Sequence, residues 1–316
     1  MLLLGEVRTC LLRTSTQLPL GVAEQVLELL PGRRVLTTTR PCAKSVSAPL
    51  LTGVDCKLAS PPQAARGSRV IGTVSANAVI TGGLVLQASA RTRVVQAARP
   101  NRLPWSHYAA LPGVVEAVTP TDAEVVADGF LGNPSPGPTL DLGAVAERLI
   151  GTVQRDRRLD HVTALRSRTI RVRWVALPDA TARTPRAEVR LVDDVVRSVR
   201  LAMPPEQLDL AQSFVEDFAL HDWLLTSLDR VIEDAERRRM AGEDPTDLVR
   251  AAVERLEHLW MPGARIATEL AGLWPALDSN PGYSRQWNSL VGRIHSQIAL
   301  RTLQALADAR RRSAGW

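Results

Sequence analysis

The pattern of hydrophobic and polar positions changes its period along the chain. Between residues 69 and 95, small or apolar residues alternate with polar ones on both sides of Gly82-Gly83, which is typical of two β-strands joined by a tight turn. A two-residue loop at these glycines would place the apolar face of one strand beside the polar face of the other. We therefore expect a hairpin with one buried face and a three-residue loop that begins at Thr81, so that Ile80 lies opposite Leu84. A five-residue loop would preserve the same parity.

Shorter patterns predict the other elements of the first two thirds. We expect strands over 2–12, 34–40 and 169–177, helices over 21–30 and 142–157, and an extended segment over 187–201 that is broken at Asp193-Asp194. Residues 41–66 are expected to be irregular, because Pro49, Pro61 and Pro62 exclude a long element.

From residue 205 onward the apolar residues recur with the helical period of 3.6. The first predicted helix carries Phe214 and Phe218 on its apolar face. A second begins at the N-cap Asp244 and ends before residue 262, and a third, over 266–274, ends at Pro275. A long terminal helix follows, whose apolar face is Trp287, Val291, Ile294 and Ile298.

A segment rich in proline and glycine, residues 132–138, separates the first of these regions from the second. The sequence therefore predicts an α+β protein in three parts. Residues 1–132 form a β-rich domain, residues 139–203 a mixed α/β segment with a basic sheet face, and residues 204–316 an α-helical domain.

The composition of the chain indicates its cellular compartment. No apolar run approaches the roughly 20 residues that a membrane-spanning helix needs, and the first apolar run stops at Gly5-Glu6. The three cysteines are odd in number and have no C-x-x-C spacing, which argues against a disulfide framework. We expect a cytoplasmic protein that neither spans a membrane nor is secreted.

The net charge of residues 1–200 and that of residues 201–316 have opposite signs. Residues 1–200 hold 26 Lys and Arg against 16 Asp and Glu, whereas residues 201–316 hold 13 against 17. A basic sheet face is expected to bind a protein partner, and binding of nucleic acid through the arginine-rich region 155–200 is the alternative. The residues assigned to this face are Arg168, Arg171, Arg173, Arg186 and Arg190.

The stretch LPWSHY, residues 103–108, gathers chemically versatile side chains. We expect Trp105 and Tyr108 to fix this loop to the sheet and to contribute to a binding surface. An enzymatic alternative pairs His107 with Cys56, because Cys56 lies between Asp55 and Lys57, which could tune a thiolate for a hydrolase or a transferase.

Other kinds of site receive less support. His221 falls on the apolar stripe of its predicted helix, one turn after Asp217, as a hydrogen-bonded core histidine does. The chain has no G-x-x-x-x-G-K-[ST] and no G-x-G-x-x-G motif, so neither familiar nucleotide cradle is present. We expect no cofactor and no metal site.

Five stretches together resemble an uncharacterised family of actinobacterial proteins whose genes cluster with that of a variant P-loop protein. The stretches are LGEVRTC (4–10), TGVDC (52–56), ITGG (80–83), LPWSHY (103–108) and FALHDWL (218–224). The resemblance spans most of the chain and implies a P-loop NTPase as candidate partner, but no activity. The sequence thus favours a non-catalytic interaction or scaffold subunit of a multiprotein system, with the thiol enzyme and the nucleic-acid-binding protein as alternatives.

Overall fold

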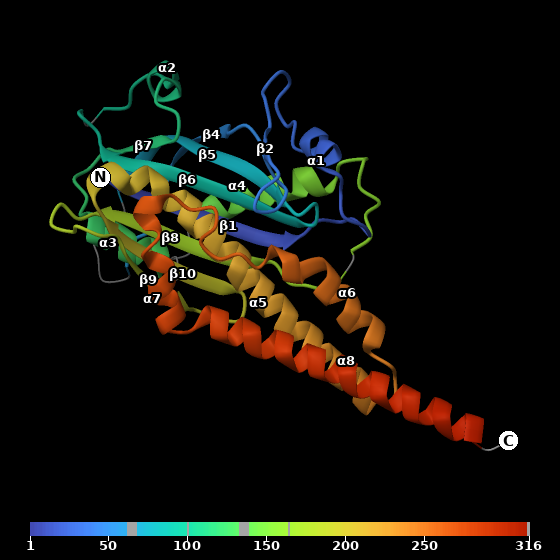
Figure 1. Ribbon diagram of the computed structural model, residues 1–316. Coiled ribbons are helices and arrows are strands. Elements are labelled where there is room, and N and C mark those ends of the chain that lie inside the picture. The colour runs from blue at the N-terminus through green and yellow to red at the C-terminus, as the bar shows by residue number, and fades with distance from the viewer. Residues whose placement is uncertain (62–67, 100, 133–138, 164, 315–316) are drawn as a thin grey trace.

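The computed structural model of the protein describes residues 1–61, 68–99, 101–132, 139–163 and 165–314. It confirms an α+β fold with a sheet formed by the first two thirds and helices in the last third (Figure 1). The strands are β1 (Leu2–Leu11), β2 (Leu36–Thr38), β3 (Lys44–Val46), β4 (Leu50–Lys57), β5 (Arg69–Thr81), β6 (Val85–Gln96), β7 (Val114–Ala117), β8 (Ile170–Pro178), β9 (Arg186–Leu191) and β10 (Val196–Met203). The α-helices are α1 (Leu20–Val26), α2 (Trp105–Ala109), α3 (Ala123–Leu131), α4 (Leu142–Gln154), α5 (Ala211–Met240), α6 (Thr246–Leu256), α7 (Leu273–Ser279) and α8 (Tyr283–Ala314).

All these strands belong to one open sheet with the order β2-β3-β5-β7-β6-β1-β8-β10-β9, and β4 pairs with β5. Strand β1 is central, because it pairs antiparallel with β6 on one side and with β8 on the other. The first two predicted domains therefore share a single sheet, and the proline-rich break does not separate two folded units. Residues 133–138 of that break lie outside the described residues.

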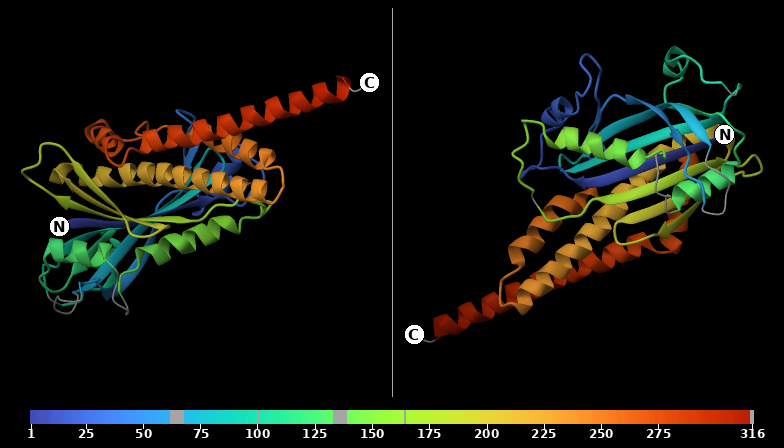
Figure 2. Two further views of the ribbon diagram at one scale, coloured as in Figure 1. Left: turned by 90° about the horizontal axis from the view of Figure 1, so that it is seen from below. Right: turned by 180° about the vertical axis from the view of Figure 1, so that it is seen from behind.

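Both faces of the sheet are covered. Leu3, Val7 and Leu11 of β1 pack in the core beneath α5, whereas Leu4 and Cys10 pack in the core on the opposite face, which contains residues of α1, α3 and α4. Figure 2 shows the two helical layers on either side of the sheet, with α8 outermost over α5. The predicted helical domain is thus one of the two layers.

The central hairpin corrects two details of the prediction. Thr81 pairs with Val85 and Ile80 with Leu86, so the three-residue loop is Gly82 to Leu84 and Ile80 does not face Leu84. Both glycines have positive φ, which a side chain would disfavour. The prediction correctly placed the apolar residues of the two strands on the same face of the sheet. It expected only one buried face, whereas both faces are buried because α5 covers the second one.

Proline misled the prediction at two places. Residues 41–61 contain the strands β3 and β4 instead of an irregular segment, and residues 62–66 of the same prediction lie outside the described residues. Pro275 was expected to end a helix, but it lies within α7. Proline is tolerated there because it is in the first turn, where backbone N–H groups have no partner within the helix. The elements α3 and β7 were not predicted.

Candidate interaction site

The structure does not bring Cys56 and His107 together. Successive side chains of a strand point to opposite faces. In β4, a Cβ atom on Gly53 would lie 3.3 Å from the Trp105 ring, so this face of the strand carries α2. Cys56 belongs to the other face and packs against the apolar core. Burial, and then the Asp55 carboxylate, raise the pKa of the Cys56 thiol to about 11, which disfavours the reactive thiolate.

The LPWSHY stretch forms the one-and-a-half-turn helix α2 rather than a loop. Tyr108 is buried, and its hydroxyl accepts a hydrogen bond of 3.1 Å from the backbone N–H of Leu103, so this ring anchors the segment as expected. Trp105 stays 43% exposed and stacks with Arg102. His107 lies with its Nε2 atom 2.8 Å from a carboxylate oxygen of Glu116 in β7. The side chains of α2 thus hold the segment in place.

The arginines of the predicted basic face are paired with carboxylates. Arg171 and Arg173 of β8 lie on the face that carries α4, and their Nε atoms lie 3.0 and 3.4 Å from carboxylate oxygens of Glu6. Arg8 contributes a third guanidinium, at 3.1 Å from the same carboxylate, which is only 3% exposed. The other pairs are Arg168–Asp194, Arg186–Asp179 and Arg190–Glu188. Because ion pairing offsets these charges, the five arginines do not form a uniformly basic sheet surface.

Arg197 of β10 points to the opposite face of the sheet and forms a buried ion pair with Asp222 of α5, with Nε 3.1 Å from the carboxylate. Tyr283 of α8 donates a hydrogen bond of 3.3 Å to the same carboxylate. Burial raises the pKa of Asp222 and that of Tyr283. This triad joins the sheet, α5 and α8.

The triad lies in the wall of a groove of about 990 Å³ between α5, the first turns of α8 and the β9–β10 hairpin. Asp222, Asp229 and Glu233 follow one face of α5 along this groove, because they are spaced by seven and four residues. Ser289 of α8 lies in the opposite wall. Acidic and basic side chains alternate around the groove, so its net charge points to no single class of small ligand.

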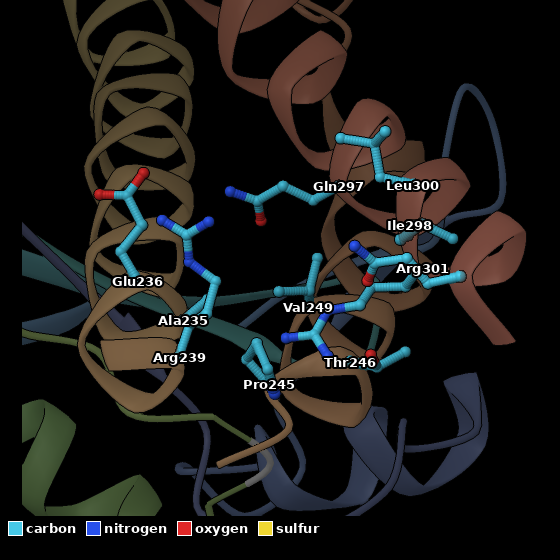
Figure 3. Close-up of a pocket in the computed structure, with 11 residues that line it drawn as sticks. Ala235, Glu236, Arg239, Pro245, Thr246, Val249, Gln297, Ile298, Leu300 and Arg301 are labelled. Atoms are coloured by element: carbon cyan, nitrogen blue, oxygen red, sulfur yellow. The ribbon is translucent and has the colours of Figure 1, made fainter. Parts of the chain in front are cut away.

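A second hollow, of about 300 Å³, lies between α5, α6 and α8 (Figure 3). Its wall combines apolar side chains, including Val249 and Ile298, with Glu236, Arg239 and Arg301. Within the described part of the chain, no group of three or more His, Cys, Asp and Glu is arranged to hold a metal ion.

His221 is a buried residue of α5, and both nitrogens of its ring contact backbone groups. Its Nδ1 atom lies 2.7 Å from the carbonyl oxygen of Asp217, and its Nε2 atom accepts a hydrogen bond from the N–H of Met261. The Asp217 carboxylate accepts hydrogen bonds from the Gly263 N–H and the Trp274 indole. Burial lowers the pKa of His221. The pair therefore fastens the segment after α6 to α5.

Three exposed leucines lie on the last turns of α8, which project past the ends of α5 and α6 (Figures 1 and 2). Leu300, Leu303 and Leu306 are 61%, 63% and 54% exposed. At about 100° per residue, Leu303 lies about 180° from Ile294, which is fully buried against the other helices. Leu303 and Leu306 therefore face away from the rest of the protein, whereas Leu300 also lines the hollow between α5, α6 and α8.

Two of these leucines continue a regular seam along the outer side of α8. The outer seam is the set of exposed residues spaced by three and four positions, namely Ser289, Gly292, Ser296, Ala299, Leu303 and Leu306. This alternation is the heptad spacing through which one helix packs along another. The seam was not predicted, because the strongly apolar residues of this helix all lie on its opposite face.

No protein-family model, curated protein or solved structure matches this chain. None of the described helices combines the length and the apolar character that crossing a membrane requires.

Proposed function

We propose that this protein is a non-catalytic interaction subunit that binds another protein chain through the outer side of α8. The observation that carries the proposal is the exposure of Leu303 and Leu306 on a helix that projects beyond its own bundle. Neighbouring exposed leucines on one helix face are unfavourable in water and typically mark a contact surface.

The chemistry of the other candidate residues supports a binding role over a thiol enzyme. Cys56 faces the core on the far side of β4 from α2, which carries His107. The arginines around Glu6 also give little support to nucleic-acid binding, because their side chains are only 11%, 29% and 18% exposed and share the buried Glu6 carboxylate. A P-loop NTPase, the partner that the family resemblance implies, stays a prediction.

Site-specific photo-cross-linking in cells that make the protein tests this proposal. A photoreactive amino acid in place of Leu303 is expected to form an adduct with a protein chain, either a second copy or another protein. The same substitution at Leu36, which is 64% exposed on the short strand β2, serves as the control and is expected to give none. The absence of any protein adduct at position 303 would overturn the proposal.

A further inference from the structure

The outer seam of α8 has a gradient of side-chain size. Its first half consists of Ser289, Gly292 and Ser296, and its second half includes Leu303 and Leu306. A parallel pairing of two such helices would place small residues against small ones and leave gaps. An antiparallel pairing instead places each leucine against a small residue, as knobs fit into holes.

From this gradient we propose that the partner at the outer seam is a second copy of this chain, with the two α8 helices antiparallel. This inference rests on the proposed interaction role and names the partner. We choose the register in which each seam residue of one copy lies against a seam residue of the other. In this register Leu306 packs against Ser296 of the second copy, and Leu303 packs against Ala299 of the second copy. Both copies make the same contacts, so the arrangement is a closed two-fold dimer.

The antiparallel arrangement brings charged residues of the two copies close together. Helix α8 contains six arginines and one aspartate, and three of the arginines, Arg310, Arg311 and Arg312, lie near its end. The antiparallel register brings this basic end beside Gly292 and Ser289 of the second copy. Ser289 lines the groove whose α5 wall carries Asp229 and Glu233. The same groove also carries Arg230, Arg237 and Arg285, so the basic end meets charges of both signs there.

The surroundings of α8 leave room for a second helix. The seam residues Gly292, Ser296 and Ala299 are exposed, and α8 is the outermost element on its side of the sheet (Figure 2). Small residues at these positions allow the two backbones to approach closely. The structure thus offers an accessible, self-complementary helix face.

Light scattering after size-exclusion chromatography tests the dimer on the full chain. We expect twice the 34.4 kDa mass of one chain. The double variant Leu303→Glu with Leu306→Glu should raise the dissociation constant by at least about 100-fold and give the single-chain mass. The equally exposed Leu36→Glu is the control and should remain dimeric. Because all three leucines are exposed, none of these changes should prevent folding, and circular dichroism checks this.

A cysteine trap tests the orientation. When copies with Leu306→Cys are mixed with copies with Ser296→Cys under mild oxidation, the mixed disulfide should exceed both symmetric disulfides. A predominance of the symmetric Leu306→Cys product would overturn the antiparallel register. A single-chain mass at every concentration would overturn the dimer, whereas a cross-link from position 303 to a different protein would still support the proposed function. The absence of every cross-link would overturn both.

Discussion

The ion cluster around Glu6 gives the sharpest test of how the arginines of β8 are used. Glu6 is buried on the central strand, and the Nε atoms of Arg8, Arg171 and Arg173 lie 3.1, 3.0 and 3.4 Å from its carboxylate oxygens. The change Glu6→Gln keeps the shape of the side chain and removes its charge. The guanidinium groups of Arg171 and Arg173 then lose the carboxylate with which they pair.

The size of the effect follows from burial. Breaking a buried ion pair by removing one partner costs roughly 3–5 kcal/mol. The three arginine side chains keep some contact with water, being 11%, 29% and 18% exposed, and Arg8 keeps a second partner in Glu147. We therefore expect Glu6→Gln to lower the free energy of unfolding by about 3 kcal/mol, at the lower end of this range.

Urea unfolding at neutral pH, followed by circular dichroism, measures this change. The matched control is Glu147→Gln, which removes a carboxylate that pairs with the same Arg8 but is 69% exposed, and which should cost less than about 1 kcal/mol. Equal stabilities of the two variants would refute the reasoning. That result would mean that Arg171 and Arg173 are not held by Glu6 and are available to bind a ligand.

Three further predictions concern the cysteines, His221 and Gly5. Burial raises the pKa of all three cysteines, to about 11 for Cys56, so a thiol reagent at pH 7 should label the folded protein far more slowly than the urea-unfolded chain; labelling of Cys56 at a comparable rate in both states would revive the thiol-enzyme alternative. Burial lowers the pKa of His221, so the unfolded chain binds a proton at higher pH than the folded one. The melting temperature should therefore fall as the pH drops below about 6.5, and this fall should be smaller in His221→Asn; identical pH profiles would contradict this role of the histidine. Finally, a Cβ atom on Gly5 would overlap the buried Trp174 ring, so Gly5→Ala should destabilise the protein by about 1–3 kcal/mol in the same urea assay, and an unchanged midpoint would show that the ring can move.

The sequence predicted those elements whose local pattern agrees with their environment. Strands β5 and β6 lie almost where alternation placed them, because each carries a continuous small or apolar face. Strand β4 was missed because its neighbourhood is rich in proline and because it is stabilised by pairing with β5, which a local pattern does not reveal. The same limit hid the sharing of one sheet by the first two predicted domains, since β1 contacts residues more than 160 positions away.

The candidate site was predicted less well than the fold. Chemically versatile residues such as Cys56 and His107 attracted attention, but strand direction places Cys56 on the face away from α2. The arginines were recognised as a group, yet the role of Glu6 depends on a contact between distant strands. The outer seam of α8 was visible in the sequence as a regular spacing. Its exposure could not be predicted from the sequence. The structure shows that no other described element covers this side of the helix.

Amide hydrogen exchange of residues 302–314 tests the central claim most directly. A helix end that projects beyond its bundle frays and exchanges quickly. If a second chain covers it, exchange should slow as the protein concentration rises, and this protection should disappear in the variant Leu303→Glu with Leu306→Glu. Rapid exchange of these amides at every concentration, equal in both proteins and unchanged by cell extract, would contradict the claim that the outer side of α8 is a binding surface.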